Sequence, residues 1–317
     1  MTTVSQAEAA TREALGPTLV RLAREGLDIA VVDGDLGIST TARVFGKAYP
    51  DRFFTLGPAE QNMIGVAAGL AACGKIAFAS SFAVFIPGRC FDQIRISVAQ
   101  PRLNVKLVAS HGGISVGEDG VSAQAIEDLA LMCSLPTFRV IVPADVVEAA
   151  QAIEAAAREE GPFYVRTGRP KVPIIYDESY RFRLGRAHLL RRGRDVTVIA
   201  CGVMVKRALD AAETLEREGI DCRVLNMATL QPLDREAIIE AARQTGAVVT
   251  AEEHQAHGGL ASLVARVLVE EAPVPMASVA INRYAESGRW DQLLEKYGLT
   301  ADVIVKKAKA VVGRKGR

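Results

Sequence analysis

One carboxylate, Glu60, stands at the head of an apolar segment that reads GPAEQNMIGVAAGLA over residues 57–71. Pro58 favours the start of a helix, which places Glu60 in the first turn, where the helix dipole favours its ionised form. The following residues are mostly small, so this helix can pack closely against another segment. On spacing alone, Glu60 could simply pair with the helix dipole, so its chemistry depends on its neighbours.

Two further segments place chemically useful side chains at predicted strand ends. Phe82 and Phe85 flank the end of a predicted strand at 76–82, and α/β sheets place ligands at such ends. The segment SHGGISVGEDGVSAQ, residues 110–124, combines His111 with two acids and four glycines. Glycines allow positive φ and a close approach of backbone to ligand. Paired phenylalanines are common in cores and glycine-rich loops are common on surfaces, so neither segment identifies a function by itself.

Short β-branched runs alternate with helical patterns, which is typical of an α/β protein with buried parallel strands. Strands are predicted at 29–35, 76–82, 104–110, 138–145 and 163–168, and again at 196–202, 222–227, 247–253 and 276–282. Helices are predicted at 58–73, 88–99, 124–134 and 145–159. Prolines and clustered charges then interrupt the pattern. We therefore expect two doubly wound α/β domains, 1–170 and 186–317, joined by a linker at 171–185.

The overall composition excludes several classes of protein. The chain has 317 residues, and its 38 basic and 37 acidic residues leave a formal net charge of +1, which does not favour nucleic-acid or membrane partners. No apolar run could span a bilayer and the N-terminus lacks the apolar core of a signal peptide, so we expect a cytoplasmic protein. Five cysteines without CxxC spacing argue against disulfides and zinc. The basic segment 306–317 is interpreted as a solvated tail.

Taken together, the segments resemble the C-terminal half of transketolase, a thiamine-diphosphate enzyme of sugar-phosphate metabolism. The resemblance covers essentially the whole chain, through TREALG, VDGDLGIST, GPAEQNMIGVAAGLA, SSFAVF, SHGGISVGEDG, VIVPAD, YVRTGRP, EEHQAHGGL and ESGRWDQLLEKYGLT. The AEQNM and GEDG blocks at this separation are the most specific part. Full-length transketolases have a further N-terminal domain, so the resemblance implies the smaller subunit of a split transketolase.

This resemblance implies a binding site for thiamine diphosphate. Glu60 matches the family's glutamate that binds a ring nitrogen of the aminopyrimidine and drives the tautomer that serves as base. Phe82 and Phe85 match the aromatic pocket for that ring, and Asp35 matches an acid near cofactor and substrate. The family's diphosphate and metal motif lies on the missing domain, so the resemblance implies that a larger partner subunit holds the diphosphate and Mg²⁺ or Ca²⁺. No metal ligand is expected in this chain.

The resemblance also implies how a sugar phosphate is held. The residues that match the family's phosphate-binding positions are Arg12, Ser39, His111 and Arg166. Asp119 matches an aspartate that binds a substrate hydroxyl, which makes Glu60, His111 and Asp119 the predicted catalytic residues.

One position departs from the family pattern. GEDG continues as VSAQ, so Ala123 stands where the family has a histidine, and alanine can neither donate nor accept a hydrogen bond there. Losing one such donor commonly costs several kcal/mol of transition-state stabilisation. Either the substrate differs from the usual ketose phosphates, or another group such as Ser122 substitutes, or turnover is slow.

The implied activity is transfer of a two-carbon ketol unit from a ketose phosphate to an aldehyde, within an α2β2 assembly. Two alternatives stay open. One is half of a related thiamine-dependent carboligase, similar to deoxyxylulose-phosphate synthase or pyruvate dehydrogenase, possibly in a specialised pathway. The other is a catalytically weakened subunit for assembly or regulation, which Ala123 supports but an intact set of Glu60, Phe82, Phe85 and Asp119 opposes.

Overall fold

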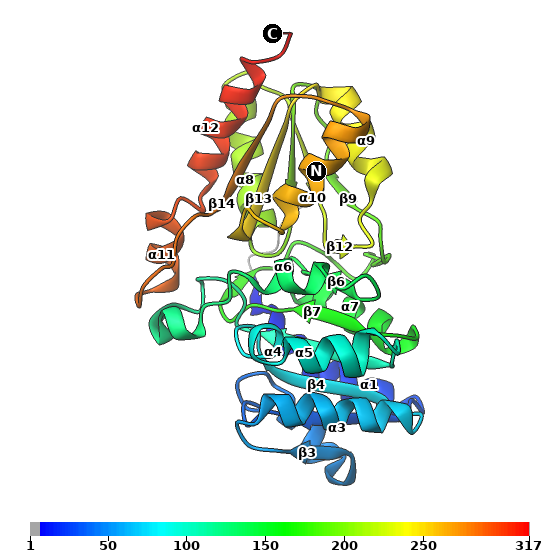
Figure 1. The fold of residues 1–317 in the computed structure, drawn as a ribbon. Helices are drawn as coiled ribbons and strands as arrows, with labels where there is room; N and C mark the ends of the chain where they lie inside the picture. The colour runs from blue at the N-terminus through cyan, green and yellow to red at the C-terminus, as the bar shows by residue number, and fades with distance from the viewer. Residues whose placement is uncertain (1–6, 317) are drawn as a thin grey trace.

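The computed structural model describes residues 7–316, which form two α/β units stacked end to end (Figure 1). The first six residues of the predicted first domain and Arg317 of the second lie outside the described residues. Over the described range, the strands form a seven-stranded sheet, a five-stranded sheet and a small two-stranded sheet.

The seven-stranded sheet forms the first unit and has the strand order β12-β6-β7-β5-β4-β2-β3. Its strands are β2 Ile29–Asp33, β3 Phe53–Thr55, β4 Ile76–Phe82, β5 Val105–Ser110, β6 Arg139–Ile141, β7 Phe163–Arg166 and β12 Thr229–Gln231. The pairs from β2 to β7 are parallel, whereas β12 is antiparallel to β6. Parallel pairing brings the carboxyl ends of these strands to one edge, where α/β proteins usually bind ligands.

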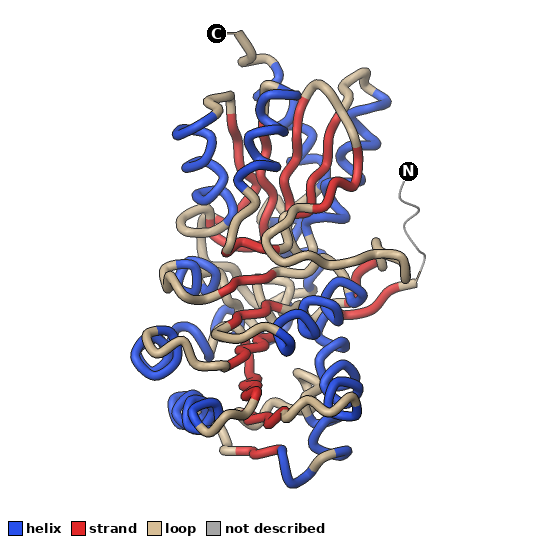
Figure 2. Tube along the Cα trace, turned by 90° about the vertical axis from the view of Figure 1, so that its right-hand side faces the viewer, coloured by secondary structure: helices blue, strands red, loops and turns tan. Residues whose placement is uncertain are grey.

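Helices cover both faces of this sheet (Figure 2). Leu15, Leu19 and Ile153 pack with Phe78 on one face, and Met63 packs with Leu107 on the other. The helices are α1 Leu15–Arg24, α2 Arg43–Ala48, α3 Glu60–Ala72, α4 Ile86–Arg89, α5 Phe91–Gln93, α6 Asp128–Cys133 and α7 Val146–Arg158. A π-helical turn runs over Ile94–Ala99, and 3-10 turns run over Thr11–Ala14, Pro50–Arg52, Gly117–Asp119 and Val121–Ala123. Covering both faces explains why β2 is buried along its whole length.

The second unit is built on the five-stranded sheet, with the order β14-β13-β10-β11-β9. Its strands are β9 His188–Arg191, β10 Val196–Ala200, β11 Cys222–Asn226, β13 Val248–Gln255 and β14 Met276–Ile281. Its helices are α8 Met204–Arg217, α9 Arg235–Thr245, α10 Leu260–Glu271, α11 Trp290–Lys296 and α12 Ala301–Val312. Asp234 and Thr300 cap α9 and α12 by accepting hydrogen bonds from backbone N–H groups of their first turns.

The structure corrects two details of the sequence interpretation. The supposed solvated tail is wrong for residues 306–312, which belong to α12. Ala308 and Val311 are buried, because they continue a helical apolar face begun by Ile304. The predicted helix at 88–99 is broken into α4, α5 and the π-helical turn. The nine predicted strands are all present, and the short strands β1 Glu8–Ala10, β3, β8 Lys171–Pro173, β9 and β12 were not predicted.

The segment between the two units is well packed. β8 pairs with β1 in an antiparallel two-stranded sheet. Tyr176 and Tyr180 are buried, and their rings stack with centroids 3.7 Å apart. Asp145, which caps α7, also accepts hydrogen bonds from the backbone N–H groups of Ile175 and Tyr176 at 2.7 and 2.8 Å. These contacts hold the segment against the first unit.

The two units share a continuous core. One buried cluster includes Leu107 from the first unit with Leu225 and Leu260 from the second. The chain also returns to the first sheet as β12, immediately after β11. Within residues 7–316, no helix combines the length and the apolar character that crossing a membrane would require.

Candidate active site

The predicted site residues gather at the carboxyl-end edge of the seven-stranded sheet. Asp35 and Ser39 follow β2, Glu60 follows β3, and His111 follows β5. Phe82 ends β4, Phe85 lies three residues beyond it, and Arg166 ends β7. Arg12 reaches this edge from the Thr11–Ala14 turn, and Asp119 lies in the loop after β5.

The first group of side chains, here called the aromatic pocket, comprises Glu60, Phe82, Phe85 and Arg89. Glu60 is the first residue of α3 and is only 3% exposed. Its Oε2 accepts a hydrogen bond from Arg89 Nη1 at 2.8 Å. The Arg89 guanidinium also lies 4.5 Å from the centre of the Phe85 ring. Arg89 therefore balances the buried charge of Glu60 and contacts the aromatic wall, a role that the sequence analysis missed.

Phe82 links this pocket to His111. The rings of Phe82 and Phe85 are nearly parallel, with centroids 5.8 Å apart and an interplanar angle of 14°. On the other side, Phe82 stacks on the His111 ring at 3.7 Å and 22°. The row of rings thus runs continuously from Arg89 to His111.

A second group, here called the cationic cradle, comprises Arg12, His111 and Arg169. Burial and the charge of Arg169 lower the pKa of Arg12. Burial, with further contributions from Arg12 and Arg169, lowers the pKa of His111 to about 3. His111 is therefore neutral at pH 7, with Nδ1 2.8 Å from Ser110 Oγ. Mutual repulsion among these groups marks a region that gains stability from an anion.

Backbone contacts fix Arg12 and Arg169 within the cradle. Arg12 Nη1 donates to the Ser39 carbonyl at 2.8 Å, and Thr41 Oγ1 donates to the Arg12 carbonyl at 2.9 Å. Arg169 Nη1 donates to the carbonyl of Val116 and to Glu118 Oε2, the latter at 2.8 Å. Arg169 is the second arginine of YVRTGRP, and the sequence analysis did not single it out.

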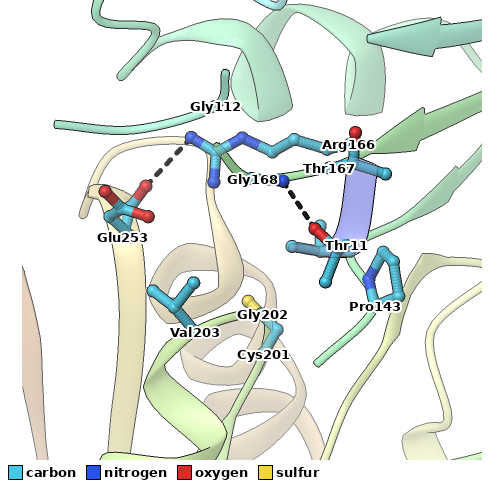
Figure 3. Close-up of a pocket in the computed structure, with 11 residues that line it drawn as sticks. Thr11, Gly112, Pro143, Arg166, Thr167, Gly168, Cys201, Gly202, Val203 and Glu253 are labelled. Carbon is cyan, nitrogen blue, oxygen red and sulfur yellow. Dashed lines mark hydrogen bonds between the residues drawn. The ribbon is translucent and has the colours of Figure 1, made fainter. Parts of the chain in front are cut away.

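Arg166 occupies a different environment from the one predicted for a phosphate ligand. It is 5% exposed, and its Nε lies 2.9 Å from Asp128 Oδ2. Its Nη2 donates to the carbonyls of Ala125 and Glu253, at 2.9 and 3.0 Å. Figure 3 shows the guanidinium reaching toward Glu253, at the wall of a small pocket that Gly112 and Gly168 also line. Arg166 thus supplies the buried counter-charge that Asp128 needs.

The remaining predicted residues lie on the open side of the edge. Asp35 is exposed and has φ of +69°, and Asp119 is exposed at the end of its 3-10 turn. Ala123 is buried, whereas its neighbour Ser122 is exposed. Among the described residues, no group of three or more His, Cys, Asp or Glu side chains is arranged to hold a metal ion.

This geometry suits two kinds of ligand at once. A flat heterocycle can pack against the wall formed by Phe82 and Phe85, with a ring nitrogen facing the Glu60 carboxylate. The cradle can bind a group with several anionic oxygens, because the charges of Arg12 and Arg169 both act on His111 there. The 3.7 Å stack of Phe82 on His111 places the two groups of side chains next to each other.

Comparisons with known proteins agree with this arrangement. Residues 7–174 match the pyrimidine-binding domain of transketolase, and residues 185–304 match the transketolase C-terminal domain. The 6-deoxy-6-sulfo-D-fructose transketolase subunit SqwH of Clostridium sp. (strain MSTE9) is 43% identical over 298 residues, which cover 94% of this chain and 92% of that protein. Human transketolase is 40% identical over 307 residues, which cover 96% of this chain but 49% of the human protein.

A solved structure gives the same result in three dimensions. A split-gene transketolase, described as an inactive β4 tetramer, superimposes with a TM-score of 0.90 at 50% sequence identity, covering 98% of this chain and 100% of that one. This chain spans about half of the human protein. Because both domain families match in order and the relatives align along nearly the whole chain, the chain belongs to the transketolase family and comprises its pyrimidine-binding and C-terminal domains.

Proposed function

We propose that this chain is the smaller subunit of a two-component, thiamine-diphosphate-dependent transketolase. It would transfer a two-carbon ketol unit from a ketose phosphate to an aldehyde. The observation that carries the proposal is the contact between the two groups of side chains, through the 3.7 Å stack of Phe82 on His111. A heterocyclic cofactor and an anionic substrate would then meet at one sheet edge.

The aromatic pocket fits the aminopyrimidine of thiamine diphosphate. Arg89 engages Oε2 of Glu60, so Oε1 can accept a hydrogen bond from a protonated ring nitrogen. When bound, thiamine diphosphate supplies the carbon nucleophile of ketol transfer. The Glu60 carboxylate, held by Arg89, would stabilise a proton on the ring nitrogen. Phe82 and Phe85 would form an aromatic wall against the ring, and Asp35 would lie near cofactor and substrate.

The cofactor's diphosphate and its Mg²⁺ or Ca²⁺ would be held by a larger partner subunit in an α2β2 assembly. Two relatives support a divided enzyme, one named as a subunit and one as a split-gene transketolase. The exposed side of α3 also supports a close subunit contact, because Gly65 and Gly69 have nothing within 4 Å of a Cβ position. We expect the chain alone to bind the cofactor poorly and to be inactive.

The cationic cradle would bind the anionic end of the donor. Arg12 and Arg169 supply guanidinium donors, with His111 and Ser39 beside them, and Asp119 would bind a substrate hydroxyl. Arg169 replaces Arg166 in this proposal, because Arg166 is committed to Asp128.

A sulfonated ketose is a second candidate donor. The Clostridium relative is named for 6-deoxy-6-sulfo-D-fructose, and Ala123 already points to an unusual substrate. Glu118 pairs with Arg169 and Glu13 partly offsets the charge of Arg12, so acids of this chain already neutralise part of the positive charge of the cradle. A sulfonate carries one negative charge, whereas a phosphate monoester carries close to two near pH 7. The balanced cradle therefore also suits a sulfonate.

A titration tests both donors. The purified chain is mixed with the larger subunit from the same genome, thiamine diphosphate and Mg²⁺, and consumption of xylulose 5-phosphate or 6-deoxy-6-sulfofructose is followed with an aldose phosphate acceptor. Activity that appears only on mixing and saturates at equal subunits supports the proposal, and the preferred donor identifies the cradle's ligand. A complex that binds cofactor but consumes neither donor, or that keeps full activity with Glu60→Ala, would overturn the catalytic assignment.

A further inference from the structure

The second unit holds the glycine-rich loop, residues 111–124, from several directions. The backbone N–H of Ser115 donates to Glu253 Oε1 at 2.6 Å. Farther along, Gln124 Nε2 donates to the carbonyl of Glu286 at 2.9 Å, and Ser287 Oγ donates to the carbonyl of Glu118 at 2.6 Å. The loop that carries His111 and Asp119 thus rests on the C-terminal domain.

Glu253 makes the deepest of these contacts. It lies near the end of β13 and is 4% exposed. Its carboxylate occupies the space beside Gly113, where an added Cβ would overlap the Glu253 side chain. Gly113 has φ of +80°, a conformation that other residues adopt with strain. The glycine and the glutamate therefore fit each other, and both are needed for this backbone path.

Arg166 also contacts the glycine-rich loop. Its Nη2 donates to the carbonyls of Ala125 and Glu253, and Figure 3 shows the contact with Glu253. A Cβ added to Gly112 would overlap the Arg166 guanidinium. The two residues that follow His111 are thus enclosed by a cation on one side and a carboxylate on the other. This enclosure sets the backbone after His111, whose own φ is +61°.

Burying the Glu253 carboxylate costs free energy that packing of the two domains alone would not require. Burial raises the pKa of its carboxyl group, and the charge of Arg166 and the contact with Ser115 oppose that rise. A well-packed apolar residue would usually join two domains at lower cost than a buried charge. A charge-assisted hydrogen bond to a backbone N–H, by contrast, fixes one loop conformation.

We propose that Glu253 is a positioning residue that acts through Ser115 to set the glycine-rich loop, and thereby the direction of His111 against Phe82 and the cradle. The C-terminal domain then completes the site without touching the substrate. The catalytic consequence rests on the proposed function, whereas the effect on the loop does not.

Amide hydrogen exchange on the whole purified chain tests the effect on the loop. Glu253→Ala should accelerate exchange in the segment 112–117 at least tenfold, whereas Glu253→Gln keeps an acceptor and should stay near wild type. Glu148→Gln is the matched control, because Glu148 is also buried but binds the backbone of Ala144, away from the loop. Unchanged exchange in folded Glu253→Ala would overturn the proposal. If that variant does not fold, Gly113→Ala must show the same acceleration of exchange in this segment. Exchange at the wild-type rate in Gly113→Ala would then overturn the proposal.

Kinetics of the assembled enzyme test the catalytic consequence. Glu253→Ala should raise KM for the anionic donor at least tenfold while kcat changes by less than threefold, and Glu253→Gln should restore most of the loss. A purely structural residue would lower the active fraction, and hence kcat, at constant KM, and that result would overturn the role through His111. If the wild-type complex is itself inactive, the proposed function fails, while the exchange result still decides the role of Glu253.

Discussion

The aromatic pocket and the cationic cradle lie side by side but treat charge in opposite ways. In the pocket, the buried carboxylate of Glu60 is already paired with Arg89 at 2.8 Å. In the cradle, burial and the charge of Arg169 lower the pKa of Arg12, and burial, with further contributions from both arginines, lowers the pKa of His111. Glu118 pairs with Arg169, and Glu13 partly offsets the positive charge at Arg12. The charge in the aromatic pocket is therefore already balanced, so its ligand can be a ring with a single polar edge. The cradle, by contrast, requires a ligand that carries negative charge.

This contrast separates two arginines that lie three residues apart. Arg166 resembles the pocket, because its charge is paired in the interior with Asp128. Arg169 belongs to the cradle, and its side chain is 34% exposed. A charge that is fully paired inside should matter for folding, and a charge that faces a ligand should matter for binding.

Removing Arg166 tests the first half of that statement. Arg166→Met should lower the free energy of unfolding by about 3–5 kcal/mol, because Asp128 would stay buried without its partner. Urea denaturation of the isolated chain measures this, and Arg169→Met is the control, with a change of about 1 kcal/mol or less. If Arg166→Met is as stable as wild type but raises KM for the donor, Arg166 is the substrate arginine and the contrast is wrong.

Removing the charge of Glu60 tests the pocket. Glu60→Gln keeps the shape of the side chain but not its carboxylate, so kcat of the assembled enzyme should fall by about 10²- to 10³-fold. Thiamine diphosphate affinity, measured by calorimetry on the assembled complex, should fall as well. Glu118→Gln removes an acid from the cradle instead and should leave kcat within a few-fold of wild type. Equal losses from the two variants would contradict a distinct role for Glu60.

Removing Arg169 tests the cradle. Arg169→Met should raise KM for a phosphorylated or sulfonated donor by about 10- to 100-fold, the loss expected for hydrogen bonds to a charged group. For a donor ketose whose end carries no charged group, such as a hydroxyacetone-type ketose, KM should not change. Arg183→Met, at an exposed arginine outside the site, is the control. A KM increase of the same size for charged and uncharged donors would show that Arg169 supports the site without binding the anion.

The sequence could predict the strands and the pocket because both depend on local pattern. Buried β-branched runs such as IAVVD specify parallel strands, and Glu60 and Phe82 stand in short segments that resemble one family. It could not reveal that Arg166 pairs with Asp128 and contacts Glu253, because these residues are distant in sequence.

The same reason explains the other omissions. Arg89 gains its role only when α4 folds against the start of α3. β12 has three residues and becomes a strand only because the second unit returns to the edge of the first sheet. Such features come from tertiary contacts, which residue spacing does not encode.

The pH dependence of stability gives the subtlest test, because burial and, to a smaller extent, the charges of Arg12 and Arg169 lower the pKa of His111. The pKa of His111 is about 3 in the folded chain and about 6.5 when unfolded, so below pH 6.5 the unfolded state binds the extra proton. Wild type should therefore lose about 1.5 kcal/mol of unfolding free energy between pH 6.5 and 5 that His111→Asn does not lose. Asparagine tolerates the positive φ at this position.

Two features make this comparison specific to the cradle. Burial raises the pKa of Glu148 and of Glu252 to about 7, and this stabilises the fold at low pH, but their contribution is common to both variants and cancels. His257→Asn, at an exposed histidine, should reproduce the wild-type curve. Inorganic phosphate should then raise the pKa of His111, because a bound anion offsets Arg12 and Arg169. An unchanged His111 titration by NMR at saturating phosphate would mean that the cradle's charges are balanced by the protein alone, as those of the pocket are.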